Sequence, residues 1–133
     1  MADIKSYKQL IEEASAKIQT LSIDDAKKKL GNPDVVFVDL REPSELENEG
    51  IIPSSLHIPR GVLEFLASPD SPYFQPVFAE DKQFILYCQS GWRSALATAT
   101  LQDMGFRRVC HIDGGFSAWK NSGGSTVTNG EEL

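Results

Sequence analysis

Cysteine is scarce in this chain, which has only Cys88 and Cys110 among its 133 residues. Two cysteines make no dense disulfide framework, and their positions do not match the ligand spacing of a metal site. Residues 1–19 lack the apolar core that a signal peptide or a membrane span requires. We therefore expect no bound metal, no membrane association and a cytoplasmic location, where a free thiol stays reduced.

Positive charge is also in short supply. The chain has 13 basic and 19 acidic residues, so its formal net charge is −6. This balance argues against nucleic acid or an anionic membrane as the main partner, because both attract basic proteins. It does not exclude a small anionic substrate, which responds to the local field of a loop. The length and the hydrophobic share of 41% are typical of one globular domain.

The most informative stretch runs from Phe84 to Ser94. Four apolar residues precede Cys88, a short loop with one glycine follows, and Ser94 opens a run rich in alanine and leucine. This pattern predicts a buried strand, a tight turn and a helix. Loop N–H groups, the helix N-terminus and Arg93 would together stabilise a thiolate. We interpret Cys88 as a nucleophile, the alternative being a plain buried hydrophobe.

Strands and helices alternate along the remaining chain. This alternation predicts an α/β fold with a mainly parallel, five-stranded central sheet and helices on both faces. The expected strands are residues 19–21, 35–38, 56–58, 84–87 and 108–112, and the expected helices are residues 3–18, 22–30, 44–49, 62–66, 94–104 and 116–120.

Three parts make up the predicted organisation. Residues 1–18 carry an amphipathic helix that packs on the outside of the domain, and residues 19–120 form the domain itself. Residues 121–133 are mostly Gly, Ser, Thr, Asn and Glu, a composition that predicts a flexible tail.

Four segments in order resemble the rhodanese family, over residues 19–120. The loop C-Q-S-G-W-R-S resembles its active-site loop, commonly written C-x-x-G-x-R-S. The other three resemble D-x-R-E, G-H-I-P-G-A-x-N-I-P and V-x-x-L-x-G-G-x-x-x-W, and they are residues 38–42 with Glu45, 50–59 and 109–119. Ile51 replaces the usual histidine and Ser54-Ser55 replaces Gly-Ala, both in a structural turn.

The resemblance implies a single-domain rhodanese-like sulfurtransferase. The Cys88 thiolate would take the outer sulfur of thiosulfate or a related donor, and cyanide or a thiol would remove that sulfur from the resulting persulfide. The covalent persulfide would serve in place of a cofactor, so none is expected. The implied partners are a small-molecule sulfur donor and acceptor, and a protein acceptor remains open.

The candidate site has one catalytic residue, Cys88, and a larger set expected to bind substrate. That set is Arg93, Arg60, Gln89, Ser90, Gly91, Trp92 and Ser94. Structural roles remain alternatives for some of them: holding the loop for Arg93, a surface ion pair for Arg60, and packing for Trp92. Asp39, Arg41 and Glu45 are expected to form a supporting polar cluster, since charged groups at a strand end need partners.

The two histidines and the second cysteine are expected to have structural roles. His57 and His111 lie in or beside strand segments and are expected to be packed and hydrogen-bonded. Cys110 lies in an apolar strand and is expected to be an inert buried thiol.

Two other functions stay open. One is a non-catalytic rhodanese-like module that binds a partner or senses sulfur. The other, less favoured, is a cysteine phosphatase or an arsenate reductase. Phosphatase loops have five residues between cysteine and arginine, whereas this chain has four between Cys88 and Arg93.

Overall fold

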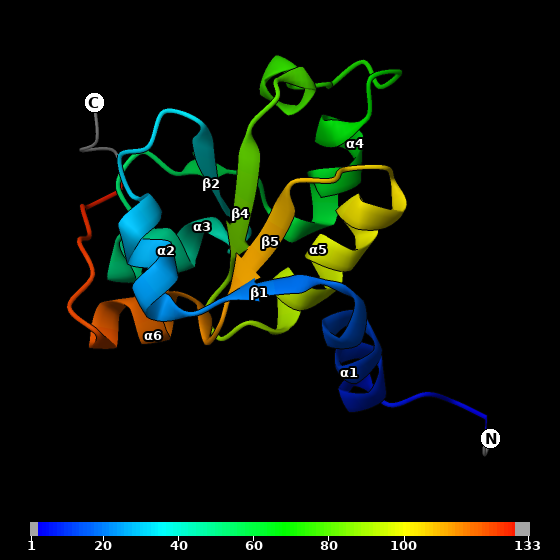
Figure 1. Cartoon of the computed structure of the whole chain (residues 1–133), viewed down its shortest axis with the longest axis horizontal. Helices are drawn as coiled ribbons and strands as arrows, with labels where there is room; N and C mark the ends of the chain where they lie inside the picture. Colours follow the sequence, from blue (N-terminus) through cyan, green and yellow to red (C-terminus); the bar gives the residue numbers. More distant parts are fainter. Residues whose placement is uncertain (1–2, 130–133) are drawn as a thin grey trace.

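The computed structural model describes residues 3–129 and shows a parallel sheet of five strands (Figure 1). The strand order is β1-β5-β4-β2-β3. The strands are β1 (Gln19–Leu21), β2 (Val35–Asp39), β3 (Leu56–His57), β4 (Gln83–Tyr87) and β5 (Val109–Ile112). Every neighbouring pair is parallel, so the predicted sheet is confirmed.

The central strands are the most apolar ones. β2 and β4 each contain four successive apolar residues, Val38 pairs with Leu86 in register, and both of these side chains are fully buried. A strand covered on both faces needs apolar residues at successive positions, which is why these two segments lie in the middle of the sheet. The short strands β1 and β3 form the edges.

Helices cover both faces of the sheet, as predicted. One core cluster joins Val38 and Leu86 to Leu101, and the other joins Phe37 and Ile85 to Trp119. The α-helices are α1 (Tyr7–Lys17), α2 (Ile23–Lys29), α3 (Pro43–Glu49), α4 (Leu63–Ala67), α5 (Trp92–Asp103) and α6 (Gly115–Asn121), and η1 (Arg60–Val62) and η2 (Pro76–Ala79) are 3₁₀ helices.

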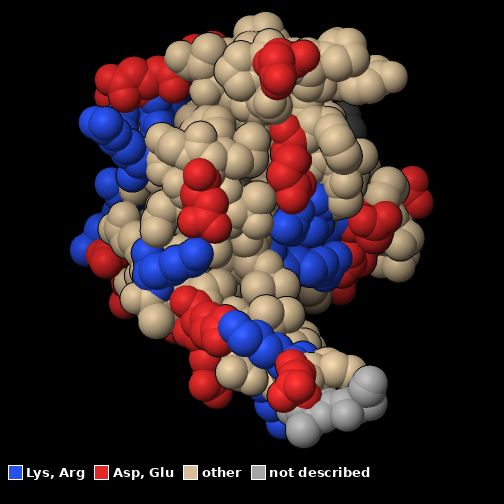
Figure 2. Space-filling model, turned by 90° about the vertical axis from the view of Figure 1, so that its right-hand side faces the viewer, with Lys and Arg blue, Asp and Glu red and all other residues tan. Residues whose placement is uncertain are grey.

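The first helix packs on the outside of the domain but begins later than predicted. Ser6 caps its N-terminus by accepting a hydrogen bond from the Gln9 N–H, so α1 starts at Tyr7 rather than at residue 3. Its C-terminal end is tied to α5, where the Gln102 amide donates to the Lys17 carbonyl. Charges of both signs are interspersed on the face of the molecule that carries α1 (Figure 2).

The prediction of a flexible tail from residue 121 is wrong for its first part. The Trp119 indole N–H donates to the Ser125 carbonyl at 2.8 Å, and Val127 pairs with Ile51 through two backbone hydrogen bonds. A polar composition therefore did not mean disorder, because a buried indole and one valine hold the segment against the domain. Residues 130–133 of the predicted tail lie outside the described residues.

Candidate active site

Cys88 lies at the carboxyl end of β4, directly before the turn into α5. Its side chain is buried, and the backbone N–H groups of Gly91 and Ser94 donate to its Sγ at 3.2 and 3.4 Å. Gly91 has a φ of 106°, a left-handed conformation that favours glycine and lets the chain turn into the helix. The loop thus aims two N–H donors at the sulfur, and a thiolate accepts such bonds more strongly than a thiol does.

A hydroxyl group adds a third polar contact to the sulfur. The Ser94 Oγ lies 3.6 Å from the Cys88 Sγ and 2.8 Å from the His111 Nδ1. The other ring nitrogen of His111, Nε2, lies 3.1 Å from the Thr20 Oγ1. His111 is therefore packed and hydrogen-bonded, as predicted, and its burial lowers its pKa. Sequence reasoning missed that one of its partners is also a neighbour of the cysteine.

The backbone of the loop is fixed from the opposite side by α6. The Phe116 N–H donates to the Cys88 carbonyl at 2.8 Å, and the Ser117 N–H donates to the Gln89 carbonyl at 3.0 Å. A Cβ atom on Gly115 would lie 2.5 Å from the Cys88 carbonyl oxygen. Gly115 is thus needed for close approach as well as for turn geometry, which its sequence context alone did not indicate.

A buried ion pair supports the loop from β2. The Arg41 guanidinium donates to both carboxylate oxygens of Asp39, at 3.0 and 2.8 Å, and both side chains are fully buried. Arg41 also donates to the Gln89 Oε1 at 3.1 Å and lies over the Phe116 ring, with Cζ 4.1 Å from its centroid. The guanidinium therefore joins the end of β2 to the loop and to α6.

Arg93 points at a carboxylate of α3. Its guanidinium donates to both oxygens of Glu45, at 2.8 and 2.9 Å, and Glu45 also accepts the Glu42 N–H. The hydrogen bond from Arg93 is the main cause that lowers the pKa of Glu45 to about 2. In return Glu45 raises the pKa of Arg93, and the proximity of Cys88 adds to that effect. The structure thus places Arg93 beside the cysteine, with its charge already paired.

The remaining loop side chains face in different directions. The Gln89 amide donates to Glu49 and Ser117, so the side chain of Gln89 belongs to the supporting network. Ser90 is exposed. Trp92 is also exposed, with its ring centroid 5.0 Å from that of Tyr7 in α1. The substrate-binding roles of these residues stay predictions.

Arg60 contacts residues outside the Cys88 loop. It forms an ion pair with Glu64 at 3.0 Å and lies 3.4 Å from the Thr100 Oγ1. Thr100 comes eight residues after Trp92, which places it about 12 Å down α5 from the end that faces Cys88. The contacts of Arg60 are those of the alternative, a surface ion pair, and a substrate contact remains only a prediction.

Other features of the described residues lie outside this cluster. Within residues 3–129, no group of three His, Cys, Asp or Glu side chains is placed to hold a metal ion, and no helix is both long and apolar enough to cross a membrane. Cys110 is fully buried, and burial raises the pKa of its thiol to about 11. This environment agrees with the prediction of an inert thiol.

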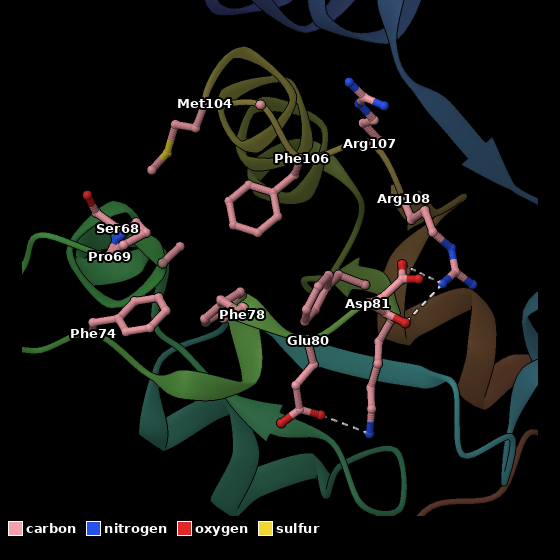
Figure 3. Close-up of a pocket in the computed structure, with 15 residues that line it drawn as sticks. Ser68, Pro69, Phe74, Phe78, Glu80, Asp81, Met104, Phe106, Arg107 and Arg108 are labelled. Atoms are coloured by element: carbon pink, nitrogen blue, oxygen red, sulfur yellow. Dashed lines mark hydrogen bonds and ion pairs between the residues drawn. The ribbon is translucent and has the colours of Figure 1, made fainter.

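Two hollows of about 590 and 670 Å³ lie away from Cys88, and no residue of the segment 88–94 lines either of them. The first lies at the amino end of β4, where Phe74, Phe78 and Phe106 turn into it and Arg108 and Asp81 pair at its edge (Figure 3). The irregular segment 67–82 is packed against the core through Phe74, Val77 and Phe78.

The fold is a parallel α/β domain, and a buried cysteine lies under N–H groups at the carboxyl edge of its sheet. These two features define the class of this protein. The model of the Rhodanese-like domain family matches residues 22–122. The chain therefore belongs to the rhodanese family, as its motifs indicated.

Several relatives of the chain are named sulfurtransferases. The chain is 34% identical over 90 residues to a sulfurtransferase of Allochromatium vinosum, a match covering 68% of this chain and 76% of that one. It is 31% identical over 125 residues to the thiosulfate:glutathione sulfurtransferase of Saccharomyces cerevisiae, covering 84% of this chain and 85% of the yeast protein.

Solved structures give the same fold with two different descriptions. A protein of unknown function from Rhodopseudomonas palustris, described as a possible tyrosine phosphatase, is 49% identical with a TM-score of 0.90, covering 92% of this chain and 95% of that one. The polysulfide-sulfur transferase homodimer of Wolinella succinogenes is 31% identical with a TM-score of 0.68, covering 91% and 86%.

Proposed function

We propose that this protein transfers sulfane sulfur from thiosulfate or a related donor to a thiol or to cyanide, through a persulfide on Cys88. The observation that carries the proposal is the pair of N–H groups, from Gly91 and Ser94, that lie 3.2 and 3.4 Å from the Cys88 Sγ. Family membership supports a rhodanese-type sulfurtransferase in general. The donor, the acceptor and the persulfide are the further steps proposed.

In the first half-reaction, the Cys88 thiolate attacks the outer sulfur of thiosulfate. A sulfur–sulfur bond to Cys88 forms, the bond to the inner sulfur breaks, and sulfite leaves with the electron pair. The persulfide's outer sulfur carries the negative charge, and we expect the N–H groups of the loop, which donate to the Cys88 Sγ, to stabilise it. In the second half-reaction, an acceptor attacks the outer sulfur and Cys88 leaves as a thiolate. No oxidant or reductant is consumed.

A low-molecular-weight thiol is the acceptor that we favour. The yeast relative, which aligns with 84% of this chain, is named for transfer to glutathione. Cyanide serves as a laboratory acceptor, and a protein is the alternative acceptor. The reaction requires a compartment in which thiols stay reduced, and we therefore infer a cytoplasmic location.

A cysteine phosphatase is the second candidate, because the Rhodopseudomonas palustris relative carries that description. Two observations favour sulfur. Only four residues separate Cys88 from Arg93, and the Arg93 guanidinium is held by both oxygens of Glu45. A phosphate monoester would need that guanidinium for its own oxygens.

The test is a matrix of substrates and variants. The protein is incubated with thiosulfate plus cyanide, with thiosulfate plus glutathione, and with an aryl phosphate. The variants are Cys88→Ser and, as a matched control, Cys110→Ser. We expect thiocyanate or glutathione persulfide from the wild type and from Cys110→Ser, and loss of all activity in Cys88→Ser.

Mass spectrometry after treatment with thiosulfate alone identifies the intermediate. We expect one added sulfur atom on Cys88 and none on Cys110. Ester turnover without sulfur transfer would make the protein a phosphatase. A stable persulfide on Cys88 without turnover, with every acceptor tried, would instead favour a sulfur-sensing module.

A further inference from the structure

A buried histidine lies behind the cysteine, and the proposed sulfur chemistry does not use it. Three contacts make a continuous chain from Cys88 to Thr20: the Sγ lies 3.6 Å from the Ser94 Oγ, that oxygen 2.8 Å from the His111 Nδ1, and the His111 Nε2 3.1 Å from the Thr20 Oγ1. Ser94 and His111 are buried, whereas Thr20 is exposed on the edge strand β1. This series of hydrogen bonds therefore leads from the buried sulfur to the surface.

The directions of these hydrogen bonds depend on one another, because a serine hydroxyl has a single proton. When Cys88 is a thiol, its S–H donates to the Ser94 Oγ, and the Ser94 O–H donates to the His111 Nδ1. The proton of the neutral ring then lies on Nε2 and is donated to Thr20. When Cys88 is a thiolate, every bond reverses, and the Ser94 O–H donates to the sulfur. The protonation of Cys88 and the tautomer of His111 are thus linked.

We propose that His111 is a positioning residue for Cys88: through Ser94 it orients a hydroxyl donor at the thiolate, and with Thr20 it carries the thiol proton to solvent. The proposal rests on the proposed function only in taking Cys88 as the nucleophile. It adds a third donor to the two N–H groups of the loop, and it gives the buried thiol a route to lose its proton.

The proton step balances without a further reagent. The Cys88 S–H bond breaks and its proton passes to the Ser94 Oγ, while the former Ser94 hydroxyl proton passes to the His111 Nδ1. The Nε2 proton leaves to the Thr20 Oγ1, and the Thr20 hydroxyl proton goes to bulk water. The products are the Cys88 thiolate, the other neutral tautomer of His111 and a hydrated proton.

The surroundings of His111 favour a ring that stays neutral while it changes tautomer. Burial is the main influence and lowers its pKa, whereas the carboxylate of Asp113 at the end of β5 acts in the opposite direction. Its partner groups are Thr20 from β1 and Ser94 from α5, and its register partner in β4 is the apolar Leu86. A neutral ring can accept at one nitrogen and donate at the other, as the relay requires.

The test measures how fast Cys88 is alkylated by iodoacetamide as a function of pH, with mass spectrometry to separate Cys88 from Cys110. The variant is His111→Asn, whose amide can still bond to Ser94 but has no second ring nitrogen for Thr20. We expect the midpoint of the profile to move up by about one pH unit, which is a tenfold lower rate near neutrality. The plateau at high pH, where the thiol is fully ionised, should match the wild type.

The plateau distinguishes positioning from a packing role. A structural defect would change access to the sulfur, so the plateau would fall while the midpoint stayed in place. That outcome, or an unchanged profile in His111→Asn, would overturn the proposal. Because alkylation needs no sulfur donor, the result is readable even if thiosulfate proves not to be a substrate.

Two further variants complete the design. Thr20→Val keeps a β-branched residue on the exposed edge strand and removes only the hydroxyl. We expect it to move the midpoint in the same direction by a smaller amount, about twofold in rate near neutrality. An unchanged profile would refute the contribution of Thr20 to the tautomer of His111. His57→Asn is the matched control, because His57 is the other histidine and its Nε2 bonds to the Arg41 carbonyl instead. Its alkylation profile should be that of the wild type.

Discussion

The two ends of strand β4 are built on different principles. Its carboxyl end carries Cys88 and meets the buried pair of Asp39 and Arg41 through the loop. Its amino end carries Phe84, which stacks on Phe78 at a centroid distance of 5.2 Å, and the ion pairs there lie on the surface (Figure 3). One strand of five residues thus joins a polar network to an aromatic cluster.

The comparison shows that one end of the strand mainly supplies stability and the other mainly fixes geometry. The aromatic end gains free energy from apolar burial, which is non-directional and tolerates small shifts. The polar end has hydrogen bonds of fixed direction around Cys88, and its charged groups are costly unless every partner is present. We therefore expect substitutions at the aromatic end to change stability alone, and those at the polar end to change both stability and the cysteine.

The largest effect is expected from Arg41→Met. It leaves the Asp39 carboxylate buried without its partner, and we expect the free energy of unfolding to fall by about 3–5 kcal/mol. Urea denaturation followed by circular dichroism measures the change. The double variant Asp39→Leu with Arg41→Met should recover part of the loss, because it removes the unpaired charge as well. A single variant as stable as the wild type would contradict a structural role for this pair.

Phe84→Ala tests the aromatic end. Phe84 is buried against Phe78 and Phe106, and we expect a loss of about 3–4 kcal/mol from the cavity it leaves. In the folded variant, the rate of Cys88 alkylation should equal that of the wild type. A changed rate would show that the two ends of the strand are coupled.

Glu45→Gln gives a smaller effect that depends on pH. The pKa of Glu45 is lowered to about 2 in the folded chain from an ordinary value of 4.5. The ion pair with Arg93 therefore stabilises the fold above pH 4.5, and this contribution is lost as the pH falls toward 2. We expect the variant to lose about 1–2 kcal/mol at neutral pH, after allowance for solvent screening, and to lose less on acidification.

Thermal unfolding at a series of pH values measures that difference. Glu12→Gln, on the exposed side of α1, is the control and should follow the wild type. If the unfolding midpoints of Glu45→Gln and the wild type fell in parallel on acidification, the pair with Arg93 would contribute nothing to stability.

The smallest effect is expected from Arg108→Ala at the aromatic end. The pair with Asp81 spans 3.3 Å, and the two side chains are 49% and 97% exposed. Water and salt screen such a pair, so we expect a change below about 0.5 kcal/mol in chemical denaturation. A larger loss would mean that this surface pair holds the hollow in Figure 3 together.

Local patterns were enough to predict most of the fold. The apolar runs in β2 and β4, the glycine before α5 and the alternation of elements each have a local physical cause, so the sheet and the cysteine loop could be read from the sequence. The tail was misread because composition does not show that Val127 can pair with Ile51.

Contacts between distant residues explain what the sequence could not predict in the site. Arg93 was expected to bind substrate, but its partner Glu45 is 48 residues away in α3. Ser94 and His111 lie in different elements, and only the packing of α5 on β5 brings their polar atoms to 2.8 Å. The residue types were visible in the sequence, whereas their pairing depends on the completed fold.

The strand order also has a consequence for the protein while it is being synthesised. β1 leaves the ribosome first but pairs with β5, whose residues are made about 90 positions later. Until then β4 has an open edge, which is prone to pairing with other chains. The contact between Thr20 and His111 can form only when β5 is in place. A nascent chain therefore carries Cys88 before the hydrogen bonds around it are complete. The cysteine gains its full set of partners only in the finished protein.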